Sequence, residues 1–301
     1  METTTTKLNR LNDVFVKYIF FDEDRKPLTL SLINSFFEAE GTPTIVDFTF
    51  KDREPDPDSP EAKRPHLDIL SVCSDGTVVE IEFQNDQYEG MAERVLLYWS
   101  RLAQKLRQGM AYVRIPRIVC INILGYEMFP ELPSYHNCYM ASNTRHPGVR
   151  LSDKLELHFA ELPKWEKAHP PAKEMDQLSC WLAYFSPKTT PEELKEIAMQ
   201  NAMINQAIQA EAPFLANAEL MSDYEWSEKQ RLDAQAREAF VKNEGIREGK
   251  IEGIKEGKIE GANNERYRIA SELLSLNMPV EQIAKTTKLT IAEVETIAEN
   301  N

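Results

Sequence analysis

The sequence predicts an α/β fold with an αβββαβ order of elements, followed by an all-helical C-terminal extension. Strand-like runs dominate residues 45–84, a helical period takes over at residues 89–108, and another strand-like run follows at residues 117–124. The strand signal ends near residue 166. These three observations predict one sheet with helices packed against it and a helical tail.

The first elements are helices. After a polar stretch at residues 1–10, which we expect to be disordered, apolar residues recur at helical spacing over residues 14–20. Helical character continues over residues 28–37. We expect both helices to cover one side of the sheet.

Three strand-like runs follow, at residues 45–50, 66–73 and 77–84. Residues 51–65 are rich in proline and charge, which predicts an exposed loop between the first two runs. The short segment at residues 74–76, Ser-Asp-Gly, predicts the turn of a β-hairpin.

The length of the hairpin loop decides which side chains share a face. A three-residue loop closed by Gly76 in the left-handed region sets Cys73 opposite Thr77 and pairs positions whose numbers sum to 150. A two-residue loop would set Asp68 opposite Phe83 and mix polar and apolar side chains on each face. The hydrophobic pattern therefore favours the three-residue loop.

On this register one hairpin face is apolar and the other is acidic. Asp68 lies opposite Glu82, with Glu80 and Gln84 beside them. Facing carboxylates destabilise a sheet by a few tenths to about 1 kcal/mol, and a bound divalent cation removes that repulsion. Oxygen ligands suit Mg²⁺ or Mn²⁺, and the main-chain carbonyl of Phe83 is a candidate for a further ligand. The alternative is that these carboxylates are simply solvated, but a hairpin followed by a crossover helix has both faces largely covered.

A crossover helix and two more strands complete the predicted sheet. Over residues 89–108, apolar residues at 4, 3, 4 spacing form one buried stripe: Val95, Trp99, Leu102 and Leu106. A right-handed crossover then places the buried strand at residues 117–124 in the same sheet. Alternating apolar residues at 155–159 predict one further strand.

The C-terminal part reads as helical. Residues 175–185, 191–210 and 224–241 have helical patterns. The repeat GIREGKIEGIKEGKIEG at residues 245–261 has glycine at every fourth position and is either a charged flexible linker or a helix stabilised in an assembly. Residues 269–298 predict short helices, with Asn277 and Lys288 at turn positions that often carry glycine, and too many acidic residues for a DNA-reading surface.

Composition limits the function classes. With 301 residues and 42% hydrophobic content, the chain can form one sizeable core and a second, smaller unit. Its net charge of −14 gives no general attraction to nucleic acid, so any DNA contact must come from a local basic surface or bound cations.

Cysteine and histidine usage gives no metal signal along the chain. The absence of a CxxC pair argues against a zinc site and suits a reducing compartment with free, mostly buried thiols. No apolar run is long enough to span a bilayer and no signal peptide is visible, so we predict a cytoplasmic protein without a membrane partner. No histidine pair has metal-ligand spacing, so none of the five is assigned a role: His66, His136, His146, His158 and His169.

Several stretches resemble, in sequence and order, the recombination-promoting nuclease family of the PD-(D/E)XK superfamily, whose members are also labelled transposases. The stretches, which span most of residues 11–165, are LNDVFVKYIFFDED, HLDILSVCSDGTVVEIEFQ, RVLLYWSRLAQKLRQGMAY, IVCINIL and LELHFAELPKW. The resemblance implies a restriction-endonuclease-like αβββαβ core that cuts DNA phosphodiesters with Mg²⁺. Asp68 and Glu82 take the places of its two acidic metal ligands, and Gln84 stands where the wider superfamily has lysine.

Three further residues are candidates for roles at the site. Gln84 cannot donate a charge-assisted proton, so we expect it to orient the attacking water or the phosphate. Asp13 and Lys17 match the family's N-terminal motif, and Lys17 is a candidate replacement for the missing lysine. The alternative is that Asp13 and Lys17 form a surface ion pair one helical turn apart.

A basic stripe on the crossover helix is the candidate DNA contact. Arg94, Tyr98, Arg101 and Lys105 follow 4, 3, 4 spacing and form a stripe distinct from the apolar one. The alternative is a solvated helix face.

The leading hypothesis is an Mg²⁺-dependent DNA endonuclease, with Mn²⁺ as a possible substitute, associated with recombination or mobile DNA. The alternatives are a catalytically weak DNA- or protein-binding scaffold that acts through its tail, and a transposase that joins strands. DNA is the expected partner, and the tail is a candidate homo-oligomer contact. The expected segments are a disordered N-terminus (1–10), a nuclease-like domain (11–165), a helical extension (166–243), a repeat linker or oligomerisation helix (244–262) and a helix-turn-helix-like unit (263–301).

Overall fold

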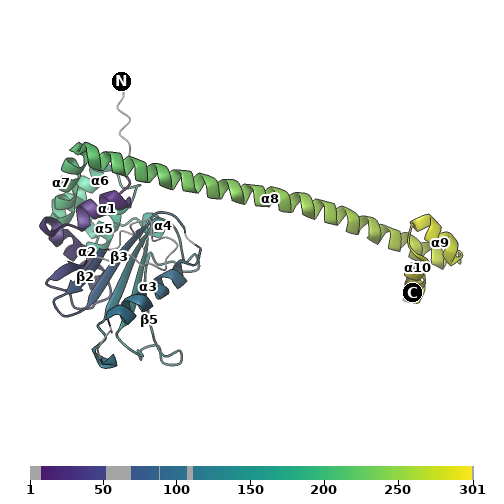
Figure 1. Ribbon diagram of the computed structural model, residues 1–301, viewed down its shortest axis with the longest axis horizontal. Helices are drawn as coiled ribbons and strands as arrows, with labels where there is room; N and C mark the ends of the chain where they lie inside the picture. Colours follow the sequence, from purple (N-terminus) through teal and green to yellow (C-terminus); the bar gives the residue numbers. More distant parts are fainter. Residues whose placement is uncertain (1–7, 52–68, 88, 107–110, 300–301) are drawn as a thin grey trace, which may run out of the picture. The chain divides into compact units, whose positions relative to one another are not determined.

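The computed structural model describes residues 8–51, 69–87, 89–106 and 111–299 (Figure 1). The expected disordered N-terminus falls mostly outside these residues, as do most of the exposed loop after the first strand and the start of the second strand. The chain divides into two compact units, Met1–Lys229 and Gln230–Asn301.

The first unit is built on a six-stranded mixed sheet with the order β1-β2-β3-β4-β6-β5. Pairs β3–β4 and β4–β6 are parallel, and the other pairs are antiparallel. The strands are β1 (Phe48–Lys51), β2 (Ile69–Cys73), β3 (Val78–Gln84), β4 (Ile118–Leu124), β5 (His136–Met140) and β6 (Leu155–Glu161). The parallel crossover from β3 to β4 runs through α3 (Met91–Leu106), as expected.

The hairpin between β2 and β3 has the predicted register. Ile69 pairs with Ile81, so paired positions sum to 150. The Cys73 amide donates to the carbonyl of Thr77 at 2.8 Å, and Gly76 has a φ of +86°. The three-residue loop is therefore confirmed, and alternate residues of β3 face opposite sides of the sheet.

Each sheet face has its own hydrophobic core. One face packs against α1 (Asp13–Phe20), α2 (Lys26–Ala39) and α5 (Gln177–Phe185), and the other packs against α3 (Figure 1). Phe83 belongs to the first face, with its ring 5.9 Å from Phe20 and 5.3 Å from Phe185. Val78 and Cys120 belong to the second face, with Val95 of α3.

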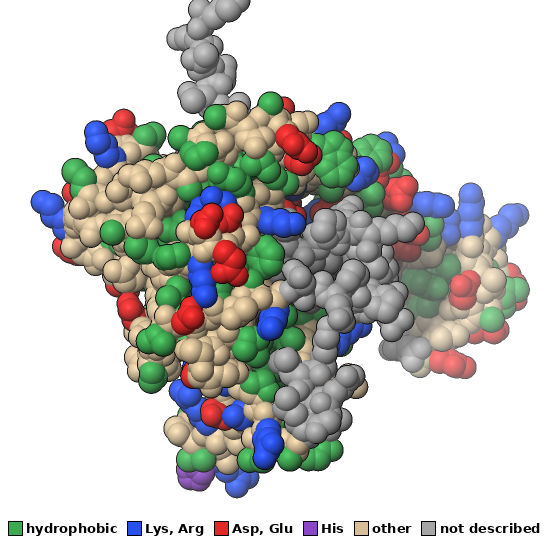
Figure 2. All heavy atoms as spheres, turned by 60° about the vertical axis from the view of Figure 1, so that its left-hand side comes forward, with side chains coloured by type: hydrophobic (Ala, Val, Ile, Leu, Met, Phe, Trp, Pro, Cys, Tyr) green, Lys and Arg blue, Asp and Glu red, His purple; other side chains and the backbone are tan. Residues whose placement is uncertain are grey.

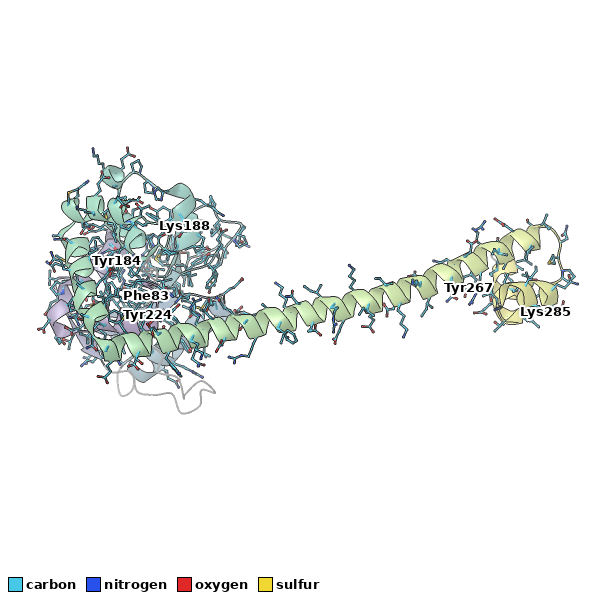
Figure 3. The ribbon with its side chains drawn as sticks, turned by 90° about the horizontal axis from the view of Figure 1, so that it is seen from above. Phe83, Tyr184, Lys188, Tyr224, Tyr267 and Lys285 are labelled. Atoms are coloured by element: carbon cyan, nitrogen blue, oxygen red, sulfur yellow. The ribbon has the colours of Figure 1, made fainter. Side chains whose placement is uncertain are left out.

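The core of the first face continues beyond residue 166. After α4 (Leu162–Ala168), Trp181 of α5 and Phe214 of α7 (Ala202–Ala216) are fully buried in it. Tyr224, at the start of α8, joins the same core, and Figure 3 shows it with Phe83 and Tyr184 among the packed side chains of this unit.

The helix expected over residues 191–210 is two helices, α6 (Pro191–Gln200) and α7. Asn201 separates them: it has a φ of −124°, and its side-chain oxygen accepts hydrogen bonds from the amides of Met203 and Ile204. Asparagine favours such a cap because its short side chain reaches the free amides of the first turn.

A single helix, α8 (Ala218–Ser275), contains the glycine repeat. Residues 245–261 thus lie within a helix, and whether an assembly stabilises it stays a prediction. Its isoleucines are exposed, with exposed fractions of 60%, 62%, 51% and 55% for Ile246, Ile251, Ile254 and Ile259.

The last residues form α9 (Val280–Thr287) and α10 (Ile291–Glu299), which pack with the end of α8 around Ala270, Ile283 and Val294. Asn277 and Lys288 adopt φ values of +58° and +61° at the two turns, where the sequence predicted glycine-like positions. Among the described residues, none of the helices combines the length and the apolar character that a membrane span needs.

Candidate active site

Glu80 and Glu82 of β3 face α3 and are buried. Their exposed fractions are 6% and 7%. Alternation along the strand sends Val79, Ile81 and Phe83 to the other face, so the two carboxylates share the side of the sheet that α3 covers. The expectation that the crossover helix covers this face is confirmed, and a buried carboxylate requires a partner.

Arg94 of α3 is a partner of Glu82. Its Nη2 atom lies 2.9 Å from Oε1 of Glu82, and its side chain is 12% exposed. Its guanidinium carbon also lies 5.2 Å from the ring centre of Tyr98. Arg94 therefore points to the sheet at the acidic cluster instead of standing on a solvated helix face.

The rest of the basic stripe is more exposed. Tyr98 is half-buried and Arg101 is exposed, whereas the side chain of Lys105 lies outside the described residues. On the molecular face shown in Figure 2, basic and acidic side chains are interspersed among the described residues. Any DNA contact by this stripe thus depends on a few local charges.

Two polar residues of β4 flank the acidic pair. Asn122 is the register partner of Glu82, is 1% exposed, and donates through Nδ2 to the carbonyl of His158 at 3.0 Å. Cys120 is the partner of Glu80, with its Sγ 3.6 Å from Oε2 of Glu80. Sequence analysis missed Asn122 because a polar residue inside the run IVCINIL gives no sign of which strand lies beside it.

Helix α1 brings Asp13 to the cluster. Asn12 caps the helix by accepting hydrogen bonds from the amides of Val14 and Phe15, which fixes Asp13 in the first turn. Burial, and then the negative charges of Glu228 and Glu82 in that order of size, together raise the pKa of Asp13 from 3.8 to about 6. The Asp13 side chain keeps solvent exposure, yet it lies within electrostatic reach of the β3 carboxylate.

Glu228 of α8 holds the segment before α1, a contact that sequence analysis did not find. Its Oε1 accepts hydrogen bonds from Nδ2 of Asn9 at 2.9 Å and from Nδ2 of Asn12 at 2.8 Å. The same loop is held by the hydroxyl of Tyr224, which accepts the Asn9 amide at 2.7 Å. No sequence signal marks Glu228, because it lies more than 200 residues from its partners on an otherwise charged helix.

Lys17 lies one turn after Asp13 on α1 and is exposed. Within the described residues no ion pair joins Lys17 to Asp13 or to Glu82. The surface ion pair considered as the alternative is thus not formed, and the catalytic role of Lys17 stays a prediction.

Gln84 ends β3 beside the cluster. Its Nε2 donates to the carbonyl of Asp86 at 3.3 Å, and its main-chain carbonyl accepts the amide of Gly125 at 2.8 Å. The next residue, Asn85, donates to the carbonyl of Leu11 at 2.8 Å and so ties this strand end to the start of α1. Asp68 lies outside the described residues.

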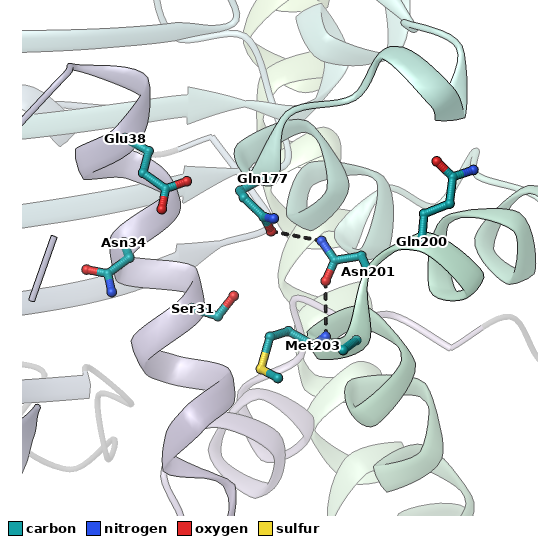
Figure 4. Close-up of a pocket in the computed structure, with 8 residues that line it drawn as sticks. Ser31, Asn34, Glu38, Gln177, Gln200, Asn201 and Met203 are labelled. Carbon is teal, nitrogen blue, oxygen red and sulfur yellow. Dashed lines mark hydrogen bonds between the residues drawn. The ribbon is translucent and has the colours of Figure 1, made fainter. Parts of the chain in front are cut away.

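A separate pocket lies between α2 and the α5 to α7 helices (Figure 4). Several of its polar groups already have partners within the protein. The side-chain oxygen of Asn201 accepts a hydrogen bond from the main-chain amide of Met203, and its Nδ2 donates to Gln177 at 2.9 Å. Ser31 accepts the indole N–H of Trp181 at 3.2 Å. None of the predicted site residues lines this pocket.

Comparison with models of protein families tests the family resemblance that the sequence suggested. The family model described as "PD-(D/E)XK nuclease family transposase" matches residues 10–239, which is most of the chain. The chain belongs to this family. The comparisons with curated proteins and with solved structures found no match.

PD-(D/E)XK nuclease family transposases belong to a nuclease class that generally uses divalent metals. Glu82 offers such an ion a buried carboxylate oxygen near the end of β3. Carboxylate oxygens are the donors that Mg²⁺ and Mn²⁺ prefer. A concentration of negative charge with oxygen donors is the environment that a divalent cation stabilises.

Proposed function

We propose that this chain is an Mg²⁺-dependent DNA endonuclease that hydrolyses phosphodiester bonds, associated with recombination or mobile DNA. The observation that carries the proposal is the buried carboxylate of Glu82 on β3 in a chain of this nuclease family, on the sheet face to which the predicted hairpin register also assigns Asp68. The mixed sheet with its α3 crossover serves as the αβββαβ nuclease core, and Mn²⁺ is expected to substitute for Mg²⁺.

The metal ligands in this proposal are the carboxylates of Asp68 and Glu82 and the main-chain carbonyl of Phe83. A bound divalent ion supplies a polarised phosphoryl oxygen and a more acidic attacking water. Gln84 orients that water or the phosphate through its side-chain amide, since a neutral amide both donates and accepts hydrogen bonds. Asp13 adds negative charge at the site, and Lys17 contacts the substrate phosphate.

Arg94 has two possible partners at this site. In the structure it neutralises Glu82, at 2.9 Å. When phosphate is present, its planar guanidinium is well suited to bind it, because two parallel N–H groups match two anionic oxygens. Tyr98, Arg101 and Lys105 extend the contact along α3 toward the DNA backbone.

A plasmid assay tests the proposal. Supercoiled plasmid is incubated with the full chain and Mg²⁺, Mn²⁺ or EDTA, and nicked and linear products are measured. Cleavage is expected with either metal, is abolished by EDTA, and is lost in Asp68→Ala and Glu82→Gln. Glu80→Gln is the matched control, because it removes a charge from the same strand and face and is expected to keep cleavage.

A second candidate function is a catalytically weak DNA- or protein-binding scaffold. The ion pair with Arg94 favours it, since that contact occupies one oxygen of the proposed ligand Glu82, and Gln84 replaces the lysine of the wider superfamily. Binding of DNA without cleavage under any divalent ion would support the scaffold. A strand-joining transposase would instead yield strand-transfer products in the same assay.

The tail is the proposed oligomerisation element. Its glycines have open space around them, and four exposed isoleucines lie between them on α8. A second chain packed there would cover these apolar side chains. The division into a nuclease-like domain at residues 11–165, a helical extension at 166–243, a repeat helix at 244–262 and a terminal unit at 263–301 belongs to this proposal, as does the cytoplasmic location.

A further inference from the structure

Three side chains with metal-binding chemistry meet on the sheet face opposite Glu82. They are Cys138 of β5 and Glu156 and His158 of β6. Cys138 is the register partner of His158, and Glu156 lies two residues earlier on the same face of β6. His158 is fully buried and Glu156 is 3% exposed, whereas Cys138 is half-buried on the edge strand.

The three potential ligand atoms face one another. The Sγ atom of Cys138 lies 4.0 Å from Nε2 of His158, and Nε2 of His158 lies 2.9 Å from Oε1 of Glu156. All three atoms lie within 4.8 Å of one another. Small movements from these separations bring a sulfur, a nitrogen and an oxygen to the distances of about 2.0–2.3 Å that a zinc ion requires.

The remaining polar atoms of Glu156 and His158 already have hydrogen-bond partners outside this group of three residues. The second ring nitrogen of His158, Nδ1, lies 3.0 Å from Nε2 of His136, and the two rings are nearly parallel at 10°. The second oxygen of Glu156, Oε2, accepts Nη2 of Arg117 at 2.6 Å. Metal-binding histidines and carboxylates characteristically have such outer partners, which fix their orientation.

A metal-free hydrogen-bond chain is the competing interpretation. It explains the contacts of His158 with Glu156 and His136, and it includes Cys138 only through the long 4.0 Å contact of its Sγ with Nε2 of His158.

We propose that Cys138 Sγ, Glu156 Oε1 and His158 Nε2 bind one Zn²⁺ ion that fastens the edge strand β5 to β6. Binding releases the Cys138 thiol proton to solvent and replaces the hydrogen bond between His158 and Glu156. His158 binds as the tautomer with its proton on Nδ1, which donates to the unprotonated Nε2 of His136. The thiolate, imidazole and carboxylate donors favour zinc over Mg²⁺, and a water completes the tetrahedral set. The thiolate and Glu156 charges balance the ion, and Arg117 stays paired with the outer oxygen of Glu156.

Sequence analysis argued against a zinc site because the cysteines and histidines lack metal-ligand spacing along the chain. Spacing rules describe ligands on one loop or helix, whereas these ligands come from two antiparallel strands. The site also lies across the sheet from Glu82, since His158 packs against Phe36 of α2. Zinc binding is therefore measurable without reference to DNA cleavage.

The test is a metal titration of the purified full chain. Metal-free protein is titrated with Co²⁺, whose thiolate complex has a charge-transfer band in the near ultraviolet, and then with Zn²⁺, which displaces it. One equivalent of Co²⁺ per chain is expected to account for the thiolate band. Cys138→Ser should lose the band, and His136→Ala should weaken metal binding roughly 10- to 100-fold. The matched control Cys180→Ala, which removes a buried cysteine elsewhere, should keep the band and the wild-type affinity.

Wild-type protein alone can overturn the proposal. If the full chain shows no thiolate band on Co²⁺ addition and Zn²⁺ does not raise its unfolding temperature, the hydrogen-bond chain is the correct interpretation. A band of unchanged intensity in folded Cys138→Ser would equally overturn it. If Cys138→Ser does not fold, as judged by circular dichroism, the wild-type titration and His136→Ala decide.

Discussion

Arg94 Nη2 and Glu82 Oε1 lie 2.9 Å apart, and both side chains are almost fully buried. The acid proposed to bind a divalent cation is thus partly neutralised by a cation that the chain itself supplies. Buried charges are stable only when paired, so Arg94 maintains the site before metal arrives. The proposed exchange of Arg94 for a metal ion at Glu82 is the physical basis of the first prediction below.

Replacing Arg94 should destabilise the metal-free chain and increase its response to Mg²⁺. Arg94→Gln leaves Glu82 as a buried charge without this partner, which costs about 3–5 kcal/mol. Urea unfolding with EDTA measures this loss, and unfolding with Mg²⁺ should recover more stability than in wild type. The exposed Arg145→Gln is the control, expected to change stability by at most about 0.5 kcal/mol. Equal effects of Mg²⁺ on wild type and variant would contradict the exchange.

Asp13 should make the chain less stable as pH rises from about 4 to about 6. Its pKa is raised to about 6 in the folded protein, chiefly by burial, so the folded state holds a proton there that the unfolded state has released. Stability is therefore highest below the unfolded pKa and declines up to the folded one. Asp13→Asn should remove this decline and be more stable than wild type at pH 7. Denaturant unfolding across this pH range measures it, with exposed Asp153→Asn as control.

The charge of Glu228 on α8 should contribute to the raised pKa of Asp13. Glu228→Gln removes one of the like charges that raise the pKa of Asp13 but keeps an oxygen for the amides of Asn9 and Asn12. The decline in stability should then shift to lower pH. Glu225→Gln, an exposed position on the same helix, should leave it in place. If both variants behave alike, Glu228 is not coupled to the site.

Glycine should be required at position 125, directly after β4, where the main chain passes close to Asn85 at the end of β3. A Cβ atom there would meet the main-chain oxygen of Asn85 at 2.7 Å, which is too close for a carbon atom. Gly125→Ala should cost about 1–3 kcal/mol, because backbone must shift to make room. Asn85 also holds the start of α1, so cleavage should fall as well. Gly148→Ala, which has open space, is the control measured by the same unfolding titration.

The glycine repeat should become more stable when its glycines are replaced by alanine. Gly249, Gly253 and Gly257 lie in the interior of α8 with open space for a Cβ. Each change should stabilise the helix by about 1 kcal/mol. The triple variant should show more helical circular dichroism at elevated temperature than wild type. No gain would support the flexible-linker interpretation.

The local patterns were sufficient to predict the hairpin and its faces. Alternation around Ser74-Asp75-Gly76 allowed one register, because a shift by one residue would have exposed the apolar side chains of β3. The positive φ values of Asn277 and Lys288 were likewise predictable, since the turns between short helices require them. The family match supports the resemblance carried by residues 11–165.

Contacts between distant segments could not be predicted. Arg94 belonged to a basic helical stripe by its spacing, and only the packing of α3 on the sheet shows that it faces Glu82. The edge strand β5 was missed because HNCYM has no apolar alternation. Glu228, Asn122 and the cluster at His158 depend on which strands and helices become neighbours, and no spacing rule encodes that.

The most direct test of the central claim is Mn²⁺ binding to the full chain, measured by electron paramagnetic resonance without DNA. The account predicts that Glu82→Gln and Asp68→Asn each weaken binding by at least about tenfold, equivalent to about 1.4 kcal/mol, whereas Glu80→Gln does not. Unchanged Mn²⁺ affinity in both folded variants would contradict a shared metal ion at Glu82.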